Sequence, residues 1–82
     1  MYLIQMSHKE GDRRLLDAEF KTEQLNRAQA YVGNGFETYE KATRGTIFLM
    51  RSRENGGLLE VGRATRKDYR EGRMYDVLKA GK

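Results

Sequence analysis

The run Ile47-Phe48-Leu49-Met50 constrains the fold of this chain most, because four consecutive positions are apolar. Successive side chains of a strand point to opposite faces of its sheet, so such a run is apolar on both faces, which suits a central position. The pattern predicts a central strand from Thr46 to Arg53. Glu54-Asn55-Gly56-Gly57 then predicts a tight hairpin turn, since Asn-Gly holds the required positive φ. Leu58 to Thr65 is expected to return as the partner strand.

A second hairpin is predicted at the N-terminus. Apolar residues recur with a period of two from Tyr2 to Ser7 and again from Leu15 to Phe20, as in strands. His8 to Asp12 lies between them and contains the glycine that a sharp bend requires. We therefore expect two antiparallel strands joined by this polar turn.

An amphipathic helix is predicted from about Glu23 to Val32, because Leu25, Ala28 and Val32 recur at helical spacing. Thr22 is a suitable N-cap for this helix. We expect Gly33-Asn34-Gly35 to end it, since these residues tolerate positive φ. Phe36 to Arg44 is then expected to be a connection with an aromatic anchor.

Together these elements predict an α+β fold: a small antiparallel sheet of about four strands, one helix packed on a face, and a basic C-terminal element. A chain of 82 residues predicts a single domain with one small core. The core residues expected from the patterns are Ile4, Met6, Leu16, Phe20, Leu25, Ala28, Val32, Ile47, Leu49, Leu59, Val61 and Leu78.

Composition narrows the environment that we expect for the protein. No apolar run approaches the ~20 residues that span a bilayer, so no membrane partner is expected. The chain contains no cysteine, which excludes disulfides and thiolate metal sites. These observations predict a protein of the cytoplasm.

The net charge of the chain resides in its last twenty residues. The stretch 63–82 contains seven Lys/Arg and three Asp/Glu, a sum of +4 that equals the charge of the whole chain. Residues 1–62 contain nine of each sign and form a neutral body. A basic arm on a neutral body predicts an acidic partner.

The arm is expected to consist of two pieces. Its cations fall on one helical stripe, but Met74 and Val77 project onto the same stripe and Gly72 interrupts it. We therefore expect a break near Gly72, with a basic turn or short helix before it. After the break, Met74 to Leu78 is expected to dock on the core, either as a helix or as a strand.

The candidate binding residues are the cations and one tyrosine of the arm, extended by two arginines of the preceding strand. Guanidinium groups bind phosphate or carboxylate in a forked geometry, and a tyrosine ring can stack on a base. Asp68 and Glu71 partly neutralise the arm, so a solvated charged surface is the competing interpretation. The residues are Arg63, Arg66, Lys67, Tyr69, Arg70, Arg73, Arg51 and Arg53.

Catalysis finds little support in the sequence. His8 is the only histidine, and it lies in the polar turn without a neighbouring carboxylate pattern, so we interpret it as a surface residue. Ser7 and Ser52 have no suitably spaced histidine. We predict that the protein is not an enzyme and uses neither a metal nor a cofactor.

The order of elements resembles that of small phage-encoded proteins, including some type I anti-CRISPR proteins. The resemblance is carried by a strand at the N-terminus (Tyr2-Leu3-Ile4), a short strand that runs into a helix (Asp17 to Leu25) and a glycine-turned hairpin (Thr46 to Val61). It implies a non-enzymatic inhibitor that binds and blocks a host nucleic-acid machine, such as a CRISPR complex or RNA polymerase. The positive charge of this chain then favours an acidic protein surface of that machine, or the nucleic acid itself, as the partner. No binding residue carries over, because no motif matches. The alternative function is direct binding of DNA or RNA by the basic arm.

Overall fold

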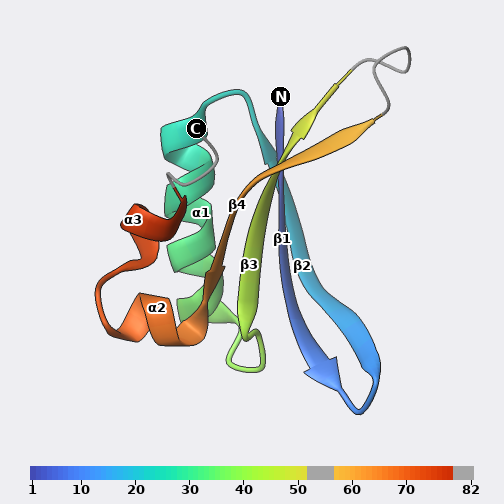
Figure 1. Cartoon of the computed structure of the whole chain (residues 1–82), viewed down its shortest axis with the longest axis vertical. Helices are drawn as coiled ribbons and strands as arrows, with labels where there is room; N and C mark the ends of the chain where they lie inside the picture. Colours follow the sequence, from blue (N-terminus) through green and yellow to red (C-terminus); the bar gives the residue numbers. More distant parts are fainter. Residues whose placement is uncertain (52–56, 79–82) are drawn as a thin grey trace.

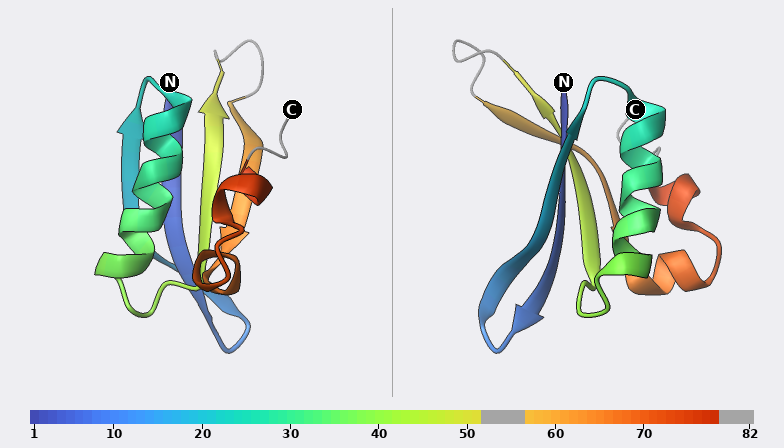
Figure 2. Two further views of the ribbon diagram at one scale, coloured as in Figure 1. Left: turned by 90° about the vertical axis from the view of Figure 1, so that its left-hand side faces the viewer. Right: turned by 180° about the vertical axis from the view of Figure 1, so that it is seen from behind.

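The computed structural model describes residues 1–51 and 57–78. The elements are β1 (Tyr2–Glu10), β2 (Arg13–Thr22), α1 (Leu25–Thr38), β3 (Arg44–Met50), β4 (Leu58–Thr65), α2 (Arg66–Arg70) and α3 (Met74–Leu78). The strands form one antiparallel sheet of four in the order β2-β1-β3-β4. The described helices all lie on one side of this sheet (Figures 1 and 2). The predicted α+β class is confirmed, with three helices in the described part of the chain. None of them is long and apolar enough to cross a membrane.

Both edge strands contain one irregular position. The register of β1 with β2 shifts between Met6 and Ser7, where Asp17 is the extra residue of β2. The register of β3 with β4 shifts between Ile47 and Phe48, where Val61 is the extra residue of β4. Such bulges bend a strand and increase its twist, which makes an edge a poorer template for further strands.

The core lies between the sheet and the helices. Strand residues, the inward face of α1 and one alanine of the connection after α1 form one buried cluster, which α3 closes with two further side chains. The cluster consists of Ile4, Met6, Ala28, Val32, Phe36, Ala42, Ile47, Ala64, Met74 and Leu78.

Three residues expected in the core are instead exposed, so these predictions are wrong. Leu16, Leu25 and Leu59 are 55%, 40% and 44% exposed. The bulge at Asp17 places Leu16 on the sheet face away from the helices, opposite Ser7 of β1. Leu25 is the first residue of α1, and Leu59 lies near the start of the edge strand β4.

The helix does not end at Gly33 to Gly35, as expected, but continues to Thr38. Neither glycine has a positive φ. A Cβ atom at Gly35 would lie 2.6 Å from Met6 Cγ, so this glycine lets α1 approach β1 closely. Phe36 lies within the added turns and is 1% exposed, which fits its expected role as an anchor. The N-cap is Gln24 rather than Thr22.

The chain breaks at Gly72, as predicted. This residue has φ +76° and lies between α2 and α3. The segment after the break is a helix and not a strand, and its Met74 and Leu78 are buried. A Cβ atom at Gly62 would lie 2.7 Å from the backbone oxygen of Leu78, so the backbone of α3 lies directly on β4.

A capping box starts α2 and fixes its direction. The Thr65 hydroxyl accepts a hydrogen bond from the Asp68 amide, and the Thr65 amide donates to the Asp68 carboxylate, at 3.2 and 2.9 Å. The bond from the Thr65 amide is the largest cause that lowers the pKa of Asp68 below its ordinary value. The box therefore orients the side chains of α2 relative to the end of β4.

Arg66 closes the C-terminal end of α1. Its Nη2 atom donates to the carbonyl oxygens of Phe36 and Tyr39 at 3.0 and 2.9 Å, and its Nε atom donates to Ala42 at 2.9 Å. The guanidinium carbon also lies 5.3 Å from the centre of the Phe36 ring. Carbonyl groups at a helix end lack partners within the helix, so this side chain satisfies them and joins α2 to α1.

We predict that Arg66→Ala lowers the free energy of unfolding by about 2–3 kcal/mol, because it leaves several carbonyl groups without their charged donor. Arg70→Ala removes the same charge from an exposed position of the same helix and should change stability by less than about 0.5 kcal/mol. Urea denaturation of both variants measures the difference. Equal unfolding midpoints would contradict the role of Arg66 as a cap.

We also predict that Gly62→Ala lowers the free energy of unfolding by about 1–3 kcal/mol, because its methyl group would meet the backbone of α3. Gly33→Ala is the matched control. Its Cβ atom would lie 3.2 Å from the flexible end of Met74, and alanine favours a helix by about 1 kcal/mol over glycine. Thermal unfolding should rank Gly33→Ala above Gly62→Ala, and the reverse order would contradict the packing of α3 on β4.

Candidate functional site

The sheet face opposite the helices presents mostly polar and charged side chains, in rows that cross all four strands. Side chains two residues apart on a strand share a face, and the strand register aligns them with their neighbours. From β2 to β4, the rows are Leu16-Ser7-Arg44-Thr65, Glu19-Gln5-Thr46-Arg63 and Lys21-Leu3-Phe48-Glu60. We call this surface the open face.

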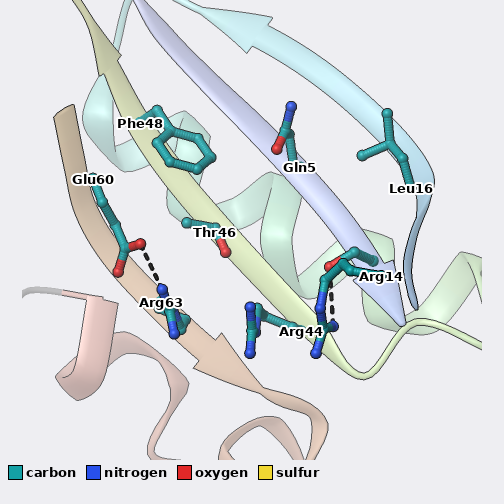
Figure 3. Close-up of a pocket in the computed structure, with 9 residues that line it drawn as sticks. Gln5, Arg14, Leu16, Arg44, Thr46, Phe48, Glu60 and Arg63 are labelled. Atoms are coloured by element: carbon teal, nitrogen blue, oxygen red, sulfur yellow. Dashed lines mark hydrogen bonds and ion pairs between the residues drawn. The ribbon is translucent and has the colours of Figure 1, made fainter. Parts of the chain in front are cut away.

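A shallow depression of about 240 Å³ lies in the open face. Figure 3 shows Phe48 at one end of it, Arg14 and Arg44 at the other, and Thr46 between them. The lining residues come from all four strands, so the depression is a feature of the whole sheet. They are Gln5, Ser7, Arg14, Leu16, Arg44, Thr46, Phe48, Glu60 and Arg63.

The depression gathers three arginines that are distant in sequence. Arg14 donates to the Ser7 hydroxyl at 3.3 Å, and Arg63 forms an ion pair with Glu60 at 2.7 Å. Burial lowers the pKa of the Arg44 guanidinium, and the positive charges of Arg14 and Arg63 lower it further. Arginine nevertheless stays charged at neutral pH. These like charges repel one another, the Glu60 carboxylate offsets part of this repulsion, and a bound anion would offset more of it.

The positive surface continues from the open face to α2. A second shallow depression is lined by Arg14, Thr43, Arg44, Thr65, Arg66, Lys67 and Arg70, and each charged residue of this set is basic. Arg14, Arg44, Lys67 and Arg70 form no ion pair with any acid in the described ranges. We define the basic cluster as Arg14, Arg44, Arg63, Lys67 and Arg70.

Three of the sequence-predicted site residues, Arg63, Lys67 and Arg70, belong to the basic cluster. Arg66 points to the end of α1 instead. Arg73 forms ion pairs with Asp68 at 3.4 Å and with Glu71. These two arginines are therefore engaged within the protein.

Tyr69 is also engaged within the protein. Its hydroxyl donates to the Glu37 carboxylate at 2.9 Å, and its ring centre lies 5.4 Å from that of Phe36. The hydrogen bond to Glu37 is the largest cause that raises the pKa of Tyr69 above its ordinary value. Its ring packs α2 against α1, on the helix side of the sheet.

Of the two arginines expected to extend the patch, Arg51 does not join the basic cluster. Arg51 follows the end of β3 opposite to Arg44, about 23 Å away along an extended strand. Arg53 lies outside the described residues, as does the predicted Asn55-Gly56 turn.

Sequence reasoning missed Arg14 and Arg44, which lie at the centre of the positive surface. A signal for Arg44 was present, since it alternates with Thr46 and Phe48 on the face opposite Ile47. For Arg14 the period of two pointed to the wrong face, because it placed this residue with Leu16 on the expected core side. The bulge at Asp17 reverses that assignment.

His8 lies at the end of β1 rather than in an exposed turn, so its interpretation as a surface residue is wrong. The His8 and Asp17 side chains are each 13% exposed, and Nδ1 lies 2.8 Å from the Asp17 carboxylate. The Nε2 atom is buried and has no hydrogen-bond partner in the described part of the chain. A general base must reach its substrate, and this nitrogen does not face solvent.

No group of three or more His, Asp or Glu side chains within residues 1–51 and 57–78 is placed to hold a metal ion.

Comparisons of the chain with protein-family models, with curated proteins and with solved structures give no match.

Proposed function

We propose that the protein is a non-enzymatic binding module that holds nucleic acid on its open face, with the basic cluster contacting phosphates. One observation carries this proposal: Arg14, Arg44, Lys67 and Arg70 converge without ion pairs to any described acid. Guanidinium groups bind phosphate through paired N–H donors, and their release of counterions favours binding.

The dimensions of the basic cluster fit a chain of phosphates. Arg14, Arg44 and Arg63 lie on β2, β3 and β4, and neighbouring strands are about 4.8 Å apart, so these residues extend across about 14 Å of sheet. Lys67 and Arg70 continue the line on α2. Five phosphate contacts would give a slope of log K against log salt of about −3.5 for a single strand and −4.5 for a duplex.

A second candidate function is inhibition of a host nucleic-acid machine by protein contact, as the resemblance to phage proteins implies. An acidic protein surface would also complement the basic cluster. Leu16 supports this candidate, because it is 55% exposed beside Arg14 and offers the apolar contact that protein interfaces use. The two candidates differ in salt dependence, which is steeper for phosphate binding.

We predict that the double variant Arg14→Ala/Arg44→Ala weakens oligonucleotide binding at least about tenfold at moderate salt and reduces the salt slope by about 1.4–1.8. The double variant Arg51→Ala/Arg73→Ala is the matched control, because it removes the same charge outside the basic cluster. Fluorescence anisotropy with labelled oligonucleotides at several salt concentrations measures both effects.

Equal losses in the two double variants would mean that net charge alone determines binding, and would contradict a site on the open face. Wild-type protein that binds no oligonucleotide even at low salt would overturn the proposed function. An interaction with an acidic protein that responds weakly to salt would then favour the inhibitor function.

A further inference from the structure

Phe48 occupies an unusual place for a large aromatic side chain. It lies in the middle of the central strand β3, on the face that no described helix covers, and it is only partly buried. In its row, Leu3 of β1 and Glu60 of β4 are its neighbours. Because Phe48 is only partly buried, part of its ring is available to a ligand on the open face.

The two ends of the depression differ in charge. Arg14 and Arg44 line the end of the depression away from Phe48, whereas the Glu60 carboxylate lines the Phe48 end (Figure 3). A phosphate is attracted to the arginine end and repelled by the carboxylate end. A planar group with N–H donors suits the Phe48 end, because it can lie against the ring and donate to Glu60.

The spacing along β3 suits one nucleotide with its neighbours. Phe48, Thr46 and Arg44 point to the open face at intervals of two residues, so about 13 Å of strand separates Phe48 from Arg44. Arg63 is paired in register with Thr46, halfway between them, and its ion pair with Glu60 holds it there. A base on Phe48 and phosphates on Arg44 and Arg14 would therefore be separated by this length of strand.

A ring on the open face can contact the flat side of a base only if that base is unpaired and unstacked. A duplex presents phosphates and base edges, and the flat sides of its bases are covered by stacking. The depression is also small, at about 240 Å³, which suits a single ring system. A duplex would gain phosphate contacts here and nothing from Phe48.

We infer that the ligand of the open face is single-stranded nucleic acid, with one unpaired base lying on Phe48 and phosphates of the same strand on Arg44 and Arg14. This inference rests on the proposed function and adds the class of ligand and the residue that recognises a base. The chemistry is shared by single-stranded RNA and DNA, so both are used as probes.

The first test compares four ligands of equal length by fluorescence anisotropy: single-stranded RNA, single-stranded DNA, the DNA duplex and an abasic single strand. Contact of one base with an aromatic side chain should favour the base-containing single strands about fivefold to a hundredfold over the abasic strand. The tighter of the RNA and DNA strands identifies the source of the ligand.

The second test changes the ring. Phe48→Leu should reduce the preference for a single strand over an abasic strand to about one, whereas Phe48→Tyr should keep most of it. Tyr75→Leu is the matched control, because Tyr75 is exposed on α3, which lies on the helix side of the sheet, and its loss should not change binding. The chain contains no tryptophan, so Phe48→Trp adds one fluorophore, whose emission a stacked base should quench and an abasic strand should not.

The outcomes separate the inference from the proposed function. Equal affinity for single strand, duplex and abasic strand, with binding still weakened by Arg14→Ala/Arg44→Ala, would overturn the inference and leave the function in place. Binding of none of the four ligands by folded wild-type protein would overturn both. If Phe48→Leu does not fold, the inference can still be tested with the wild-type protein and Phe48→Tyr. Wild-type protein that binds the abasic strand as tightly as the base-containing strands would refute the inference. Polyglutamate tests whether any polyanion can occupy the open face. If the protein binds polyglutamate as tightly as it binds a single-stranded oligonucleotide, the inference is refuted as well.

Discussion

The hydrogen bonds from Arg66 to the end of α1 are the interaction on which the rest of the architecture depends. They join the last turn of the long helix to the junction of β4 and α2, and so fix where the chain turns after the sheet is complete. With this junction fixed, Gly72 and the close contact at Gly62 direct α3 back onto β4. All the described helices thereby cover one face of the sheet and leave the other face to solvent (Figure 2).

Because the described helices cover one face only, the core lies on that face and several arginines gather on the other. The helix side is packed so closely that Gly35 and Gly62 leave no room for a Cβ atom. The open face has no such constraint, and it can hold several arginines at a cost in mutual repulsion that a bound anion offsets. The anion-binding proposal therefore follows from how the layers are arranged as much as from the net charge.

The sequence predicted much of the fold and only part of the candidate site. Strand alternation, the Gly72 break and the buried Ile47 were readable because each depends on local chemistry. Arg66 was predicted to be a binding residue, whereas it caps the end of α1. The sequence does not reveal this role, because its partners at Phe36 and Ala42 are distant in sequence and accept through backbone oxygens. The expected helix end at Gly33 and Gly35 was wrong for the same reason. These glycines allow α1 to approach other elements closely, which a local pattern does not reveal.

The two bulges also determine which residues of the edge strands share a face of the sheet. Along β2, Arg14 and Leu16 occupy even positions, whereas Glu19 and Lys21 on the same face occupy odd ones, and the parity changes at Asp17. Along β4, the parity changes in the same way at Val61, between Glu60 and Arg63. Each edge strand thus carries a half-period phase shift. In β4 the shift brings Arg63 onto the face of Arg44, and in β2 it brings Glu19 and Lys21 onto the face that Arg14 already occupies.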